Sequence, residues 1–230
     1  MNGRTPDILY EDNHLLVVLK PPGVPSQGDS SGDADMLTLL KAYVKERYQK
    51  PGAVYLGLVH RLDRPAGGVM VFARTSKAAA RLAEQMGDGR FTKQYLCVCE
   101  GTPPGGRLEH YLTKDTAANR VTATLQPRPG AQWAALEYEP RRTVEGRTLC
   151  AVRLLTGRPH QIRVQMAAIG CPLWGDQRYN PAARPGQWLA LWSTELAFDH
   201  PTRGERMTFT ALPEPNPGTL WAAFDQTLPH

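Results

Sequence analysis

The chain has 230 residues, of which 41% are hydrophobic and 21% charged, and it is long enough to bury a substantial core. No segment has the roughly 20 consecutive apolar residues that a membrane helix needs, and the first residues lack the apolar stretch of a secretory signal. We therefore expect a cytoplasmic protein without a membrane partner. The net charge of +5 permits a polyanionic partner without requiring one.

The N-terminal part predicts a hairpin, a loop and a helix. Two apolar runs, 8–10 and 15–19, flank a polar turn and predict a β-hairpin. The stretch 27–35 is rich in Gly, Ser and Asp and predicts a loop. Asp35 then precedes an expected helix over 36–48, whose first turn it would cap.

The middle of the chain predicts mostly strands. Strand-like runs over 56–62 and 69–73 enclose a turn with proline and glycine, and an Ala- and Leu-rich helix follows over 76–86, with Gly87 as its stop. Further strands are predicted over 94–100, 107–112, 120–125, 133–139 and 148–155, and a compact hairpin turn joins the last two.

The last third predicts one helix and two strands. Pro159 would open the helix and Gly170 would close it, while the stretch 188–212 resembles two strands. Because strands outnumber helices and mostly follow one another directly, we predict an α+β fold with a mixed, largely antiparallel sheet flanked by helices and loops.

Neither an internal repeat nor an interdomain linker is visible, so we expect one domain over 1–230 and a monomer. The Pro-rich tail, 213–230, is expected to pack loosely, with Leu220, Trp221 and Phe224 as candidate anchors.

The cysteines predict buried, reduced thiols. Cys97 and Cys99 alternate within an apolar strand, so both point to one face. Together with Cys150 and Cys171 they include no Cys-x-x-Cys pair, which a zinc or disulfide framework favours.

Arginines gather between residues 140 and 163, where Glu145 is the acidic residue that opposes them. They are Arg141, Arg142, Arg147, Arg153, Arg158 and Arg163. Guanidinium groups bind phosphates bidentately. A solvated arginine-rich face explains the pattern equally well.

The segment 60–68 carries the strongest chemical signal. An apolar run passes directly into charge and then bends through proline and glycine, so a strand would present side chains from a loop. Asp63 lies between Arg61 and Arg64, whose charges would keep its carboxylate ionised, as a nucleophile must be. Taken alone, a structural Arg–Asp pair or a turn-capping aspartate is the simpler interpretation.

Three other segments change this interpretation. They are Lys20-Pro21-Pro22-Gly23 after an apolar strand, Lys93-Gln94-Tyr95 at the start of another, and Gly157-Arg158-Pro159-His160-Gln161-Ile162-Arg163 with the following stretch 170–179. Together with His60-Arg61-Leu62-Asp63 they resemble the RluA-type pseudouridine synthases in order and spacing. The resemblance covers roughly residues 8–212 and implies the catalytic domain alone, without the accessory RNA-binding domain at the front of some relatives.

The resemblance implies a cofactor-free, metal-free isomerase that converts a uridine in structured RNA, ribosomal or transfer, to pseudouridine. Asp63 matches the essential aspartate, which acts at the anomeric carbon of the ribose by direct attack or by assisting glycal formation. Tyr95 matches the tyrosine that stacks on the flipped base and is a candidate for removing the proton from carbon 5. Arg163 matches the arginine that pairs with the aspartate.

Contacts to RNA are predicted around these residues. Arg61 matches a position associated with RNA contact beside the vacated stack. The other predicted RNA-binding residues are Arg64, Lys93, Arg141, Arg142, Arg147, Arg158, His160 and Gln161. Without the resemblance, a packed strand tyrosine is the preferred interpretation of Tyr95. A solvated helix arginine explains Arg163 about as well, and His160 could bond to a neighbouring loop.

The chain departs from the family pattern after the aspartate. Ala66-Gly67-Gly68 stands where Thr-Ser-Gly or Val-Ser-Gly is common, which removes a hydroxyl and is expected to loosen the turn. Two other functions are weighed. A non-catalytic RNA-binding or RNA-folding protein would keep the fold without the chemistry, and a metal-dependent nuclease would need clustered carboxylates that the sequence does not show.

Overall fold

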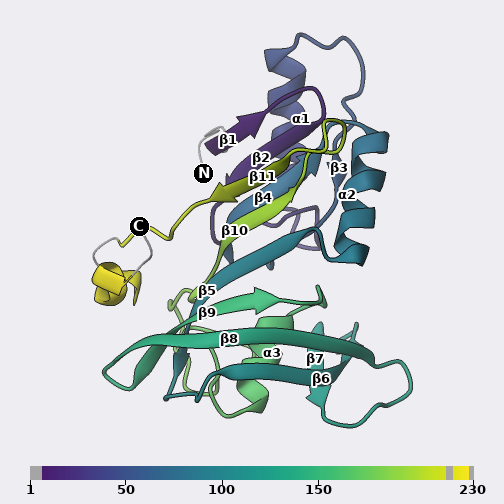
Figure 1. The fold of residues 1–230 in the computed structure, drawn as a ribbon. Helices are drawn as coiled ribbons and strands as arrows, with labels where there is room; N and C mark the ends of the chain where they lie inside the picture. The colour runs from purple at the N-terminus through teal and green to yellow at the C-terminus, as the bar shows by residue number, and fades with distance from the viewer. Residues whose placement is uncertain (1–6, 216–219, 228–230) are drawn as a thin grey trace. The chain divides into compact units, whose positions relative to one another are not determined.

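The computed structural model describes residues 7–215 and 220–227, and the chain divides into two compact units (Figure 1). The first unit comprises Met1–Lys93 and Ser193–Ala211, and the second comprises Gln94–Trp192 and Leu212–His230. Within the described residues, no helix combines the length and the apolar character needed to cross a membrane.

The first unit is built on a sheet whose strands lie in the order β1 (Asp7–Glu11), β2 (Leu15–Lys20), β4 (Gly67–Ala73) and β10 (Leu191–Asp199). The short β3 (Gly57–Leu58) pairs with β4, and β11 (Arg206–Thr210) pairs with β10. The predicted N-terminal hairpin is confirmed, because β1 and β2 pair antiparallel. The two strands expected within 188–212 are confirmed as β10 and β11.

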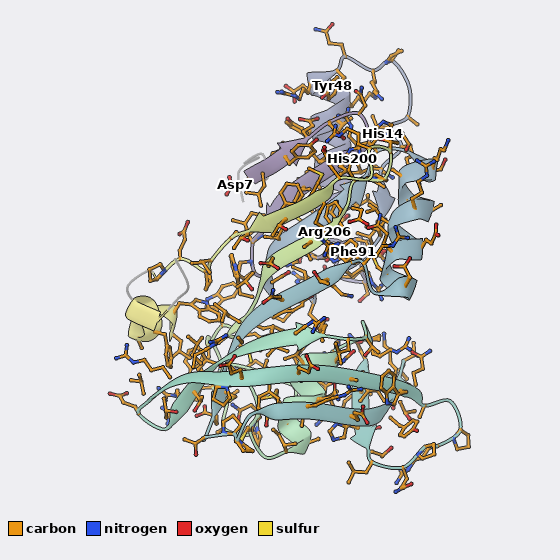
Figure 2. All side chains as sticks on the ribbon, in the orientation of Figure 1. Asp7, His14, Tyr48, Phe91, His200 and Arg206 are labelled. Carbon is orange, nitrogen blue, oxygen red and sulfur yellow. The ribbon has the colours of Figure 1, made fainter. Side chains whose placement is uncertain are left out.

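The core of the first unit lies on both faces of its central strands. All of β4 is buried, as are the first four residues of β2. On one face, Leu82 packs with Val71 and Phe198 in a single apolar cluster. The rings of Phe91 and Phe198 stack at 5.2 Å between centroids, and Figure 2 labels Phe91 in this core. Burial of each such aromatic or aliphatic side chain contributes about 1.5–3 kcal/mol.

Two helices complete the first unit, and both begin at side-chain caps. The helix α1 (Met36–Arg47) starts after the predicted cap Asp35, whose carboxylate accepts a hydrogen bond from the Thr38 amide at 3.0 Å. The helix α2 (Ser76–Asp88) runs beyond its predicted stop. Gly87 lies inside the helix, and Gly89, whose φ of 83° is left-handed, ends it instead.

The strand predicted over 56–62 is wrong for most of its length. β-pairing is confined to Gly57–Leu58. From His60 onward a side chain replaces the ladder, because the imidazole Nε2 accepts the backbone N–H of Val71 at 3.1 Å. The chain therefore reaches Asp63 as a loop that His60 holds to β4.

The second unit contains a sheet in the order β5 (Thr92–Glu100), β9 (Arg147–Leu154), β8 (Gln132–Val144), β6 (Gly106–Asp115) and β7 (Arg120–Thr124). All five predicted strands are present, and the hairpin between β8 and β9 turns through Glu145 and Gly146, both at positive φ. The strand β8 extends past its predicted end, with a register shift between Pro140 and Arg142 where proline interrupts the ladder.

One helix, α3 (Gln161–Ala168), packs on this sheet through Val164, which clusters with Val121 and Tyr179. The helix begins two residues later than predicted: Pro159 precedes it, and His160 adopts a left-handed φ of 52° at its N-cap. In the tail, the 3₁₀ helix η1 (Leu220–Thr227) contacts β8.

Several further predictions are tested by the structure. Trp221 and Phe224 of η1 are buried, as expected of anchors. The predicted burial of the thiols is confirmed for Cys97, Cys99 and Cys150, while Cys171 is half-buried. The sheets are mixed and mostly antiparallel, so the predicted α+β class is confirmed.

Candidate active site

Asp63 lies half-buried in a turn of the first unit that a buried lysine organises. The side chain of Lys20, at the end of β2, is fully buried, and its ammonium donates to the carbonyls of Pro21 (3.0 Å), Arg64 (3.1 Å) and Ala66 (2.6 Å). The amide of Ala66 also donates to the Asp63 carbonyl at 3.0 Å. The backbone on the C-terminal side of Asp63 is therefore held by one buried charge and by a turn of its own.

Lys20 is the cation that sequence reasoning missed at this turn. Burial lowers the pKa of its ammonium to about 7, and the charge of Asp63 opposes that change. A buried cation needs partners, which here are backbone carbonyls that no sequence pattern displays. The available signal was a lysine at the end of an otherwise apolar strand.

The Ala66-Gly67-Gly68 segment, which lacks the family's hydroxyl, leads directly into β4. Ala66 is buried, and Gly68 is paired with Lys20 in the β2–β4 ladder. Gly68 has a φ of 121°, and a Cβ there would lie 2.2 Å from the Ser193 carbonyl oxygen. Glycine is thus required at 68 because backbone approaches backbone.

His60 and Lys93 are two poorly solvated bases of the same unit. Burial, with a further contribution from the charge of Lys93, lowers the pKa of His60 to about 3, so the ring is neutral. Burial also lowers the pKa of Lys93. His60 holds the segment before Asp63 to β4 through the Val71 amide. Lys93 is the last residue of the Met1–Lys93 segment, and its amine is partly desolvated.

Of the predicted RNA contacts in the first unit, Arg61 and Arg64 are exposed. Arg64 is engaged within its own unit: its Nε donates to the Gly23 carbonyl at 3.0 Å and its Nη1 to the Ser31 hydroxyl at 2.9 Å. Its guanidinium also bonds the carboxylate of Asp33.

Arg163 lies in the second unit, where it forms an ion pair with Asp176. Its Nε and Nη2 donate to the two carboxylate oxygens at 2.8 and 2.7 Å, and both side chains are buried. Burial would raise the pKa of Asp176, but Arg163 and the amides of Arg178 and Tyr179 outweigh it and hold the pKa below its usual value. The solvated-arginine interpretation is wrong. The pairing of Arg163 with Asp63 stays a prediction.

His160 and Tyr179 support this ion pair. The Nδ1 of His160 lies 2.8 Å from the Tyr179 hydroxyl, which also accepts the Val121 amide at 2.8 Å. The tyrosine ring lies near the guanidinium groups of Arg163 and Arg120, at 5.2 and 5.3 Å from its centroid. His160 thus bonds to a neighbouring loop, one of the alternatives that the sequence left open.

Tyr95 and Gln161 are both buried in the second unit. Tyr95 stands in β5, which agrees with either of its interpretations. The amide of Gln161 is bonded inside the protein: its oxygen accepts from Thr156 and Arg158, and its nitrogen donates to the Ala135 carbonyl at 2.9 Å. Gln161 therefore holds the turn that carries Arg158.

The arginine cluster of the second unit is more neutralised than its sequence indicates. Three of its members have carboxylates from neighbouring strands or strand positions: Arg141 with Glu139, Arg147 with Glu100 and Arg153 with Glu137. Counting the charges within 140–163 missed these carboxylates because all three lie outside that range. Glu100 and Glu137 stand on β5 and β8, the two strands next to β9. Arg141 and Arg142 are exposed near the end of the β8–β9 hairpin.

Among the residues that the structure describes, no group of three or more His, Cys, Asp or Glu side chains could hold a metal ion. Two thiols that approach one another, Cys99 and Cys150 at 3.9 Å, lie in the core of the second unit.

The chain matches known proteins over most of its length. Residues 14–168 match the model of the RNA pseudouridylate synthase family. Ribosomal large subunit pseudouridine synthase D of Yersinia pestis is 36% identical over 225 residues, which is 90% of this chain and 67% of that protein. The uncharacterized RNA pseudouridine synthase YlyB of Bacillus subtilis is 34% identical, over 90% of this chain and 69% of that protein.

Solved structures agree at the level of the fold. The human RNA pseudouridylate synthase domain containing 4 protein superposes with a TM-score of 0.74 at 21% identity, over 90% of this chain and 88% of that one. The human RNA pseudouridylate synthase domain containing 1 protein superposes with a TM-score of 0.72 at 23% identity, over 94% of this chain and 86% of that one. Because the family model and the sequence relatives match most of the chain, the chain belongs to the RNA pseudouridylate synthase family. It is an RNA pseudouridine synthase of the RluA type.

Proposed function

We propose that this enzyme isomerises a uridine of ribosomal RNA to pseudouridine, with Asp63 as its catalytic carboxylate. The observation that carries the proposal is the Asp63 turn, where the buried ammonium of Lys20 binds the carbonyls of Arg64 and Ala66 and fixes the backbone that presents the carboxylate. Ribosomal RNA is preferred because several relatives are named for the large ribosomal subunit.

The reaction exchanges one bond of the ribose for another. The bond from the anomeric carbon to N1 of uracil breaks, the base rotates, and a bond to carbon 5 forms, while the proton of carbon 5 is lost and N1 gains one. Asp63 would act at the anomeric carbon, by attack or by assisting glycal formation. Tyr95 would stack on the base and is the candidate acceptor of the carbon-5 proton.

Extruding a uridine from structured RNA costs a few kcal/mol, which stacking and phosphate contacts must offset. In the proposal, Arg61, Arg142 and Arg158 supply such contacts, with Lys93, Arg141 and Arg147 as further candidates. Arg163 would pair with the catalytic carboxylate, and Asp176 fixes the orientation of its guanidinium plane. His160 and Gln161 would contribute by holding the loop and turn around Arg163 and Arg158.

The test is Asp63→Asn, measured as pseudouridine formed in large-subunit ribosomal RNA from a strain that lacks the enzyme. We expect the rate to fall by about 10³-fold or more, as when an essential nucleophile is removed, with RNA binding retained. Asp7→Asn, at an exposed aspartate of the same unit, is the matched control and should keep full activity.

Two outcomes favour other functions. A wild-type chain that binds RNA but forms no pseudouridine in any cellular RNA would be a non-catalytic RNA-binding protein. Cleaved RNA, with activity lost in chelator, would indicate a metal-dependent nuclease. A pseudouridine lost from transfer RNA alone in the deletion strain would replace the ribosomal substrate while leaving the role of Asp63 intact.

A further inference from the structure

Residues 27–34 form an exposed loop whose two ends are held together. The amide of Met36 donates to the Pro25 carbonyl at 2.9 Å, which closes the loop at its base as in an Ω-loop. Every residue from 27 to 34 is exposed. We call 27–34 the acidic strap, because it carries Asp29 and Asp33.

The acidic strap contacts Arg64, the residue that follows Asp63. The Nη1 of Arg64 donates to the Ser31 hydroxyl at 2.9 Å and lies 3.5 Å from a carboxylate oxygen of Asp29. Its Nη2 bonds the carboxylate of Asp33. Two carboxylates and a hydroxyl thus occupy guanidinium donors that could otherwise bind the two non-bridging oxygens of a phosphodiester.

The base of Arg64 is fixed, whereas its outer contacts are weak. Its carbonyl accepts from the Gly23 amide at 2.8 Å and from the buried ammonium of Lys20. By contrast, the side chains of Arg64, Asp29 and Asp33 are 41%, 40% and 53% exposed. Exposed ion pairs contribute little and are screened by salt, so a polyanion can compete for the guanidinium.

The acidic strap can leave Arg64 at low cost. It buries no apolar side chain, and it includes Gly28 and Gly32, which give its backbone freedom. Asp29 and Ser31 are bonded to one another at 2.5 Å, so the strap keeps local contacts of its own when it moves.

We propose that Arg64 is a phosphodiester subsite beside the catalytic turn, which the acidic strap occupies in the unbound protein and an RNA phosphate takes over. The proposal rests on the proposed function, because it requires RNA as the ligand. It assigns to Asp29 and Asp33 a competitive role: their carboxylates hold the place of the phosphate and lower the affinity for RNA.

The test measures binding of a fluorescein-labelled RNA stem-loop with uridines in its loop, by fluorescence anisotropy at fixed salt. Asp29→Asn with Asp33→Asn should lower the Kd by about threefold to tenfold, the range expected for exposed ion pairs. Arg64→Gln should raise the Kd. In the Arg64→Gln background the two asparagine substitutions should have no further effect.

A matched control removes two carboxylates from another exposed arginine of the same unit. Glu84 and Asp88 lie 3.9 and 2.6 Å from Arg90, and Glu84→Gln with Asp88→Asn changes the net charge equally. This control should leave the Kd nearly unchanged. An equal gain in affinity in the control, or the same gain without Arg64, would reduce the effect to net charge and overturn the proposal.

Hydrogen exchange provides a second measurement. Saturating RNA should speed exchange of the amides at 29–33, since the strap is released. If the acidic strap instead stabilises the RNA-bound conformation, RNA will slow that exchange and the asparagine substitutions will weaken binding. Either result overturns the proposal. Pseudouridine formation is assayed separately: a strap that behaves as proposed in a chain that forms no pseudouridine would refute the proposed function alone.

Discussion

At the scale of single residues, two buried charges hold their neighbours in place: Lys20 binds the backbone that follows Asp63, and Asp176 binds the guanidinium of Arg163. Asp63 and Arg163 stand out through their motifs. Lys20 and Asp176, which fix the backbone or the guanidinium beside them, could not be assigned these roles. Their partners are backbone carbonyls 44 and 46 residues away and a side chain 13 residues away, which periodicity and local spacing do not relate.

Lys20 should make stability depend on pH. Its pKa is about 7 in the folded protein and 10.5 in the reference state, so between these values the unfolded chain binds more protons and the free energy of unfolding rises with pH. Lys20 contributes at most about 1.4 kcal/mol per pH unit to the slope. Urea unfolding at several pH values from about 7 to 8 measures it, below the range where the unfolded thiols ionise and the raised pKa values of Cys99, Cys150 and Cys171 act with the opposite sign. Lys20→Met should flatten the slope, although it also lowers stability by leaving three carbonyls without their donor.

Lys41→Met is the control, because Lys41 is an exposed lysine of α1. That variant should keep the wild-type slope. A slope that survives unchanged in Lys20→Met would mean that another group releases the proton. The lowered pKa of Lys93 contributes with the same sign, so a residual slope is expected in every variant.

At the scale of elements, hydrophobic periodicity identified nearly every strand and helix, and errors lie at their ends. The stretch 56–62 reads as a strand because it is apolar, yet the ring of His60 takes up the Val71 amide and ends the pairing. Glycine was also ambiguous as a stop signal. Both Gly87 and Gly89 follow the apolar part of α2, and only the backbone angle at 89 distinguishes them.

Alanine at these two glycines should have opposite effects on stability. Gly87 is exposed inside α2, and a Cβ added there would meet no atom within 4 Å, so Gly87→Ala should stabilise the protein by about 0.5–1 kcal/mol. Gly89 holds a φ of 83°, so Gly89→Ala should destabilise it by about 1 kcal/mol. Thermal unfolding of the two variants beside the wild type checks both signs. Destabilisation by Gly87→Ala would show that the helix ends where the sequence predicted.

At the scale of the whole molecule, the order of motifs along the chain was more informative than any local pattern. The chain leaves the first unit after Lys93 and returns to it at Ser193, so residues of one unit come from both ends of the sequence. Local periodicity cannot foresee such a return. The resemblance succeeded because it compares whole arrangements of motifs, and it therefore predicted the enzyme family, whereas the α+β class followed from the number and order of the expected strands and helices.

Net charge is likewise a property of the whole molecule, and its effect on RNA binding is measurable as a salt dependence. Each phosphate contact by a lysine or arginine contributes about 0.7–0.9 to the slope of log Kd against log salt concentration. If Arg141 and Arg142 both contact phosphates, replacing the two by serine should reduce that slope by about 1.4–1.8. The measurement is a salt titration of RNA binding by wild type and variant.

The control for this prediction is Arg107→Ser with Arg128→Ser. Both arginines are exposed in the second unit and lie outside the arginine cluster. This variant loses the same formal charge at positions outside the predicted RNA contacts, so its slope should stay near that of the wild type. Equal slopes in the two variants would mean that RNA binding depends on the total charge of the chain. Arg141 and Arg142 would then contribute no more to binding than other exposed arginines.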